Sequence, residues 1–249
     1  MASLSLRRLI LAGAFAFAAT PAFAFGTYAE GQTTMTIKRF ESSGVIIESW
    51  EGSAEVATYN KSEKCAELEN QCYTVVRNLI LFSVRPDTDQ GKLAAELQKN
   101  LNKEILVSYK IHRIESLSLS TDFEVTGIIE AQDRLGPDLP AKKVVRKTGG
   151  KRNFSVLGKI LQLEYSGTVV GTYEGIYLDS QSGKVHPFSI TSQEMANHAM
   201  KVMALRREYN IGVSQAYATG FRKSDCDIFE INMNEPAGTL DAPKEAETN

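Results

Sequence analysis

A sixteen-residue segment occurs twice in this chain, and the duplication constrains the fold more than any other feature of the sequence. Residues 37–52 read IKRFESSGVIIESWEG and residues 160–175 read ILQLEYSGTVVGTYEG, with six identical residues at equal positions and no gap. Most other positions keep their chemical character, as where Trp50 corresponds to Tyr173. Since an internal repeat places the same packing demands on both copies, we expect two related structural units in one chain.

The similarity continues downstream of this segment, in the same order. LFSVR at residues 81–85 corresponds to PFSIT at 187–191, and TDFEV at 121–125 corresponds to SDCDI at 224–228. The offset between the copies falls from 123 to 106 residues, because the first copy carries an insertion of 17 residues that holds two cysteines. The insertion is therefore an addition to the shared scaffold.

Each copy shows the same succession of predicted elements. Three β-rich segments come first, one segment of helical periodicity follows, and two more β-rich segments end the copy. The apolar positions of the helical pattern are Leu93, Leu97 and Leu101 in the first copy and Met195, Met200 and Met203 in the second. This order resembles the OB-fold, a five-stranded Greek-key barrel. We predict a mainly β protein of two tandem OB-like five-stranded barrels, at residues 33–131 and 155–232, each with one helix between strands three and four, joined by a linker at 132–154.

A short motif of the form G-x-x-x-x-[ST]-[WY]-E-G occurs in both copies, at residues 44–52 and 167–175. With the surrounding segment FESSGVIIESWEG, it resembles a family of small exported bacterial proteins with OB-like folds. The resemblance covers both halves of the chain. It implies the fold, and it implies no particular activity.

The first 24 residues have the pattern of an export signal. Arg7 and Arg8 precede an apolar run of 12 residues, and Ala22-Phe23-Ala24 form a small-x-small cleavage site. A membrane-spanning helix needs roughly 20 apolar residues, so this run is predicted to be cleaved near Ala24 rather than retained as an anchor. No later segment is apolar enough to span a bilayer. We expect a soluble periplasmic or secreted protein, with a disordered tail at 235–249.

The charge balance of the mature chain argues against nucleic acid as a partner. Without the first 24 residues the chain has 26 basic and 30 acidic residues, whereas phosphate binding needs an excess of Lys and Arg on one face. The predicted linker is basic, with Lys142, Lys143, Arg146 and Lys147. This run fits either a contact with a polyanion or acidic surface, or an ordinary solvated linker.

The aromatic residue and the acid of the repeated motif form the candidate binding site, Trp50 with Glu51 and Tyr173 with Glu174. Both aromatics could pack against the barrel wall, with the following glycines easing a bend of the strand. Alternatively, OB-like barrels bind ligands on strands two and three, where the rings would stack on sugars and the acids would accept hydrogen bonds from sugar hydroxyls. In the repeated Phe-Ser pairs, at 82–83 and 188–189, we expect the phenylalanines to point inward and the serines outward.

Other reactive groups give weak or negative signals. Cys65 and Cys72 could form a disulfide in an oxidising compartment, whereas Cys226 is predicted to be a small buried thiol. The cysteine spacing matches no zinc site, and the sequence contains no motif for a cofactor. Few histidines are available as a catalytic base, so we expect no catalytic residues. A pair of acids, such as Glu51 with Glu41, could serve a glycosidase only if the two converged in a cleft.

The leading hypothesis from the sequence is a non-enzymatic exported protein that binds an envelope protein or a glycan through its OB-like barrels. The alternative is a structural or assembly component of the cell envelope. A glycan hydrolase that uses paired carboxylates is the third interpretation.

Overall fold

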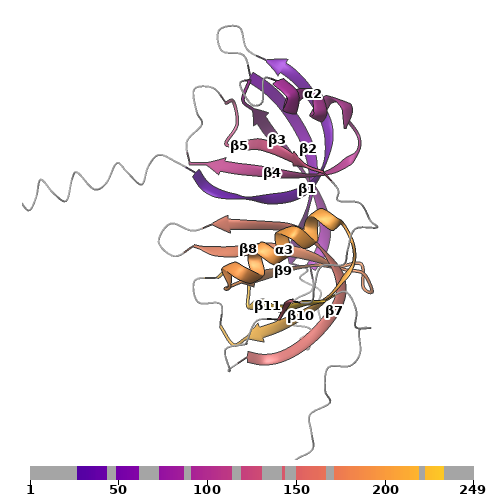
Figure 1. The fold of residues 1–249 in the computed structure, drawn as a ribbon, viewed down its shortest axis with the longest axis vertical. Coiled ribbons are helices and arrows are strands. Elements are labelled where there is room, and N and C mark those ends of the chain that lie inside the picture. The colour runs from indigo at the N-terminus through magenta and orange to yellow at the C-terminus, as the bar shows by residue number, and fades with distance from the viewer. Residues whose placement is uncertain are drawn as a thin grey trace, which may run out of the picture.

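The computed structural model describes residues 27–43, 49–61, 73–86, 91–113, 119–130, 142–143, 150–166, 171–218 and 222–232. The first half contains β1 (Thr27–Ser43), β2 (Ser49–Lys61), β3 (Tyr73–Val84), α2 (Lys92–Lys99), β4 (Glu104–His112) and β5 (Phe123–Ile129). After a short β6 (Lys142–Lys143), the second half contains β7 (Gly150–Ser166), β8 (Thr172–Asp179), β9 (Val185–Ile190), α3 (Gln193–Leu205), β10 (Tyr209–Ala216) and β11 (Cys226–Asn232). The prediction of a mainly β chain, with one helix in each copy, is confirmed over these residues (Figure 1).

Each half closes on itself through backbone hydrogen bonds. In the first half the strands follow the order β1, β2, β3, β5, β4 and return to β1, and in the second half the order is β7, β8, β9, β11, β10 and back to β7. The contact between the third and fifth strands is parallel in both halves and rests on one registered pair, Ser83 with Glu124 and Ser189 with Asp227. This junction has the fewest paired residues in each ring, so side chains must support it.

The two rings are joined edge to edge. Residues 29–33 of β1 pair antiparallel with residues 162–166 of β7, which makes one continuous sheet of eleven strands. The chain nevertheless has two hydrophobic cores. One gathers side chains around Phe82 and Leu97 under α2, and the other gathers side chains around Phe188 and Met195 under α3. Figure 1 shows the first half above the second, each with its own helix.

A buried acid stabilises the seam between the halves. The Glu164 carboxylate accepts hydrogen bonds from the Tyr109 hydroxyl and from Lys223 Nζ, both at 2.8 Å, and Gln162 Nε2 donates to the Tyr109 oxygen at 3.1 Å. Burial raises the pKa of Tyr109, and the charge of Glu164 raises it further. Burial alone would lower the pKa of Lys223, but its hydrogen bond to Glu164 and the charge of that acid outweigh burial and raise it. The bonds to Tyr109 therefore join the two halves beside the β1–β7 pairing, and the Lys223–Glu164 ion pair within the second half satisfies the buried acid.

The strands extend beyond the predicted barrel limits. Strand β1 begins at Thr27 rather than 33, and β7 begins at Gly150 rather than 155, because the early part of each strand pairs with the fourth strand of its ring. The segment predicted as a linker, 132–154, therefore includes the start of β7, and its β6 pairs with β11. The predicted export signal at 1–24, the predicted tail at 235–249, the cysteine pair at 65 and 72, and residues 146 and 147 lie outside the described residues. Within the described part of the chain, no helix is long and apolar enough to cross a membrane.

Candidate functional site

Trp50 and Tyr173, the aromatics of the repeated motif, are half-buried at matching places on β2 and β8. The Trp50 ring stacks on Phe40, with 5.5 Å between ring centroids, and packs against the first core. Tyr173 lies 4.9 Å from Tyr165, packs against the second core, and donates a hydrogen bond from its hydroxyl to Gln193. These contacts favour packing over a ligand platform for both rings.

Glu174, the acid of the second copy, is buried and surrounded by protein donors. Its carboxylate accepts hydrogen bonds from Thr172 Oγ1 at 2.7 Å, Ser189 Oγ at 2.6 Å and the Lys223 backbone N–H at 3.1 Å. Lys223 belongs to the loop that leads into β11. The acid therefore ties the β8–β9 hairpin to the fifth strand at the weakest junction of the ring.

Glu51 has the same arrangement in the first copy. Its carboxylate accepts hydrogen bonds from Ser49 Oγ at 2.6 Å, Ser83 Oγ at 2.9 Å and Ser120 Oγ at 2.5 Å. Ser120 belongs to the loop that leads into β5. Because the two acids make equivalent contacts, their recurrence in the sequence is explained by closure of the ring.

Gly52 and Gly175 make room for a phenylalanine ring on the neighbouring strand. Gly52 pairs with Phe82 and Gly175 pairs with Phe188, and a Cβ at either glycine would lie 2.3 or 2.5 Å, respectively, from Cζ of that ring. The register irregularities that bend the sheet occur on β1 and β7 instead. The expectation that these glycines ease bending of the strand is therefore wrong. Glycine is needed at both positions because a side chain would collide with the phenylalanine ring.

The serines beside these phenylalanines point away from the cores, as expected, but they are not exposed. Phe82 and Phe188 are buried in the cores as predicted, but Ser83 and Ser189 are also 0% exposed. They face away from the core side and are covered by the loops before β5 and β11, to which they are hydrogen-bonded.

The paired acids are direct neighbours on adjacent strands. Glu41 is the direct register partner of Glu51, and Glu164 is the partner of Glu174. These acids do not line the cavity at one end of the second ring, which is described below, or the cavity of the first half that Ile80, Ile111 and Phe123 line. Glu164 and Glu174 accept hydrogen bonds from protein donors, as described above, which favours a structural role for this pair.

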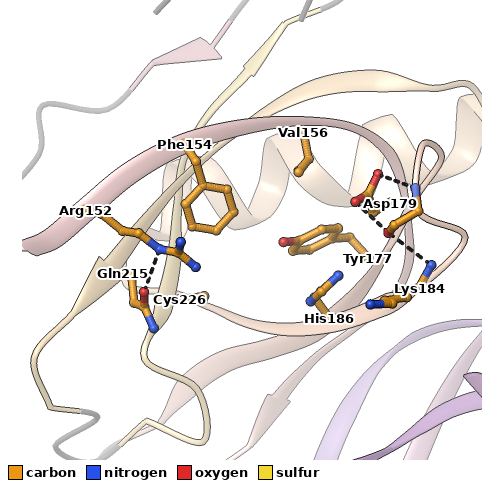
Figure 2. A pocket seen from close by; sticks show the side chains of 10 residues that line it. Arg152, Phe154, Val156, Tyr177, Asp179, Lys184, His186, Gln215 and Cys226 are labelled. Carbon is orange, nitrogen blue, oxygen red and sulfur yellow. Dashed lines mark hydrogen bonds between the residues drawn. The ribbon is translucent and has the colours of Figure 1, made fainter. Parts of the chain in front are cut away.

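The second half contains a cavity that the sequence analysis did not identify (Figure 2). It has a volume of about 290 Å³ and lies at one end of the ring, between the start of β7, the β8–β9 hairpin, the end of β10 and the start of β11. Arg152 and Phe154 line it from β7, Tyr177 from β8 and His186 from β9. The Tyr177 and His186 rings are stacked, with 5.4 Å between their centroids.

The two halves differ at the residues that line this cavity. Tyr177 pairs with Ile160 and His186, whereas the corresponding Ala54 pairs with Ile37 and Ile80. By the same registers, Asp179 and Lys184 stand where the first half has Val56 and Asn78. The scaffold therefore forms with small or apolar side chains at most of these positions, and it does not require the polar ones. The sequence contained one sign of this cavity, which is that its lining residues differ between the two copies of the repeat.

The charged groups of the cavity are held in different ways. The Asp179 carboxylate accepts hydrogen bonds from the Gln181 and Ser182 backbone N–H groups, at 2.9 and 3.3 Å, and from Ser182 Oγ at 2.7 Å. Burial alone would raise its pKa, but these bonds and the nearby His186 lower it. Arg152 Nε donates to Gln215 Oε1 at 2.9 Å.

Cys226 also lines the cavity, and it is buried as predicted. Burial raises the pKa of its thiol to about 12, and the charge of Asp225 adds to the shift. The protonated thiol is a poor nucleophile at neutral pH. Among the described residues, no cluster of three or more His, Cys, Asp or Glu side chains could hold a metal ion.

Two residues of the basic run are already paired with acids. Lys142 forms an ion pair with Glu194, and Lys143 Nζ lies 3.3 Å from Glu230. These pairs anchor β6 beside α3 and β11, and they lower the positive charge that this run could offer to a polyanion.

A family model described as "Domain of unknown function (DUF8785)" matches the chain twice, at residues 26–134 and 149–238. The chain belongs to this family. The two DUF8785 matches fall on the two halves and confirm the tandem duplication inferred from the repeat. No curated protein matches the chain.

Two solved structures are similar over most of the chain. A deletion variant of the single-stranded DNA binding protein from Thermus aquaticus has 11% identity and a TM-score of 0.26, covering 89% of this chain and 98% of that one. The wild-type protein has 10% identity and a TM-score of 0.25, covering 88% and 97%. TM-scores this low carry no argument about the function of this DUF8785 protein.

Proposed function

We propose that this chain is a non-enzymatic binding protein made of two tandem OB-like barrels, with its ligand site at the mouth of the second barrel. The closed ring of five strands in each half, with a helix between the third and fourth strands, supports the barrel assignment. The protein acts outside the cytoplasm, in the periplasm or beyond, after removal of residues 1–24. The first barrel supports the second through the seam.

The observation that carries this proposal is the difference between the two copies. One scaffold is used twice, yet only the second copy places Tyr177, Asp179, Lys184 and His186 around a cavity. Small-molecule pockets span about 300–1,000 Å³, so a cavity of about 290 Å³ suits one ring of a glycan, one side chain of a protein or a molecule of that size. The partner is therefore recognised through a single protruding group.

The outer face of β3 supports a second function, as a docking component of the cell envelope. Leu79 and Leu81 alternate along this strand and are 64% and 63% exposed. Exposed apolar neighbours of this kind are typical of protein contacts. A protein partner would cover these leucines, whereas a small ligand at the second barrel would leave them unchanged.

A fragment titration followed by NMR tests the leading proposal. We expect anionic, neutral or cationic ring fragments to shift the Tyr177 and His186 resonances saturably. Replacing His186 by Ile, the residue at the corresponding place in the first half, removes the stacked partner of Tyr177. It should weaken the best fragment about tenfold or more, roughly 1.4 kcal/mol.

The matched control is Ile80→His, which makes the reverse exchange in the first half and should leave fragment affinity unchanged. If no fragment of any charge shifts the cavity resonances, or if both variants weaken binding equally, the second barrel does not carry the site.

A further inference from the structure

We propose that the cavity of the second half binds a carboxylate attached to a six-membered ring, with Arg152 and the Tyr177 hydroxyl holding the carboxylate. This inference rests on the proposed function and names the chemistry of its ligand. Four features of the cavity support it, namely the state of the arginine, the state of the tyrosine, the balance of charge and the shape of the walls.

Arg152 is oriented but not neutralised. Its guanidinium lies over the Phe154 ring, 5.0 Å from the centroid, and its Nε is bound to Gln215. No acid of the described residues forms an ion pair with it. A guanidinium has five N–H donors in a planar fork that matches a carboxylate. The terminal nitrogens of a fixed, unpaired arginine are therefore available to a ligand at the mouth of the cavity.

Tyr177 presents a hydroxyl to the same end of the cavity. The residue is 2% exposed, and Figure 2 shows its oxygen pointing into the cavity toward the side where Arg152 and Cys226 lie. Among the described residues the hydroxyl has no hydrogen-bond partner. The hydroxyl oxygen is accessible from the cavity, so a carboxylate oxygen of a ligand can accept its hydrogen bond in place of water. Burial raises the pKa of Tyr177, which keeps the hydroxyl protonated as a donor.

The balance of charge favours an anion. Lys184 also lines the cavity and forms no ion pair in the part of the chain that the structure describes. Asp179 is the only carboxylate among the lining residues, and its oxygens are occupied by the turn at 181–182. Asp225 is not one of the lining residues, and the Gln215 amide donates a hydrogen bond to it at 2.9 Å. Two unpaired cations thus face one acid that is already bound.

The walls of the cavity favour a flat ring. Phe154 and Val156 line it from β7, opposite the stacked pair of Tyr177 and His186 (Figure 2). Aromatic faces bind both aromatic rings and the apolar face of sugars. A ring acid therefore has two sources, an aromatic acid or the uronic acid of a glycan, which share the carboxylate.

Titration with three probes, followed by NMR of the full mature chain, tests this inference. Benzoate carries the anion on an aromatic ring, benzamide is its neutral isostere, and D-glucuronate carries the anion on a sugar ring. We expect saturable shifts of the Tyr177 and His186 resonances with benzoate or glucuronate. Benzamide should bind more weakly than benzoate by about tenfold, or should not bind at all. The tighter of the two acids identifies the source.

Variants separate the two contacts with the carboxylate. Arg152→Gln and Tyr177→Phe should each weaken the better acid by about tenfold, because each removes a hydrogen bond to a charged group. Arg77→Gln, which changes an exposed arginine on β3, is the matched control and should leave affinity unchanged. Circular dichroism of each variant establishes that it is folded.

The outcomes distinguish this inference from the proposed function. If benzamide binds as tightly as benzoate, or if Arg152→Gln leaves the acids unaffected, the carboxylate assignment is overturned while ligand binding stands. If neither acid gives saturable shifts but another fragment does, the same conclusion holds. Absence of binding by every fragment overturns both.

Discussion

Replacing Gly175 by alanine is expected to lower the free energy of unfolding by about 3 kcal/mol, the upper end of the usual cost of overpacking a core. The added Cβ would lie 2.3 Å from the Gln162 carbonyl oxygen and 2.5 Å from Cζ of Phe188. The phenylalanine ring is fully buried, and the carbonyl belongs to a strand that is paired on both sides. Neither neighbour can move without disturbing the second core, so urea denaturation should show a large fall in the midpoint.

Gly127→Ala is the control for this experiment. Its added Cβ would have Ser108 Oγ as its near neighbour, at 3.0 Å, and a hydroxyl can rotate away. We expect a loss below about 1 kcal/mol. Equal midpoints for Gly175→Ala and the wild type would show that the close approach of Phe188 is not a requirement of the fold.

Replacing Glu174 by alanine should also destabilise the protein by about 3 kcal/mol, because it leaves buried donors unsatisfied at roughly 1–3 kcal/mol each. The affected donors are the Lys223 backbone N–H and the Ser189 hydroxyl, which as a donor would keep only its 3.2 Å hydrogen bond to the Ser224 carbonyl. Glu51→Ala is the matched variant. Since Glu51 is more exposed than Glu174, water can replace some of its contacts, and we expect a loss of about 1 kcal/mol.

This pair of variants decides between the two interpretations of the repeated acid. If the acids are structural, unfolding in urea changes and benzoate affinity in the folded protein does not. If Glu174→Ala keeps full stability but loses glycan binding, the acid belongs to a ligand site. That result would support the alternative hypothesis from the sequence, in which the repeated acids accept hydrogen bonds from sugar hydroxyls.

The repeat predicted the order of elements well, because that order depends on local patterns that both copies share. The extended segments 37–52 and 160–175 could be predicted because their sequences are similar to each other. The two helices could be predicted from the spacing of their apolar residues. The seam could not be predicted in this way, because the pairing of β1 with β7 joins segments far apart in the chain and depends on their backbones. The buried Glu164 gave no sign of its role, since its partners Tyr109 and Lys223 are distant in sequence.

The candidate site shows how a repeat can direct attention away from function. Trp50, Glu51 and their counterparts recur because each ring needs the same packing and the same tie between strands. Tyr177 and His186 are not repeated, because the scaffold accepts alanine and isoleucine at the same places. In a duplicated chain, shared residues report chiefly on folding, and the differences between copies are where a binding site should be sought.

The edge-to-edge pairing of the halves also has a consequence for dissecting the protein. Either half expressed alone would keep its closed ring but would present an unpaired strand, residues 29–33 or 162–166, to solvent. Open strands of this kind readily recruit another copy. A separated half should therefore elute as a homodimer in gel filtration, with its twin in the place of the missing neighbour.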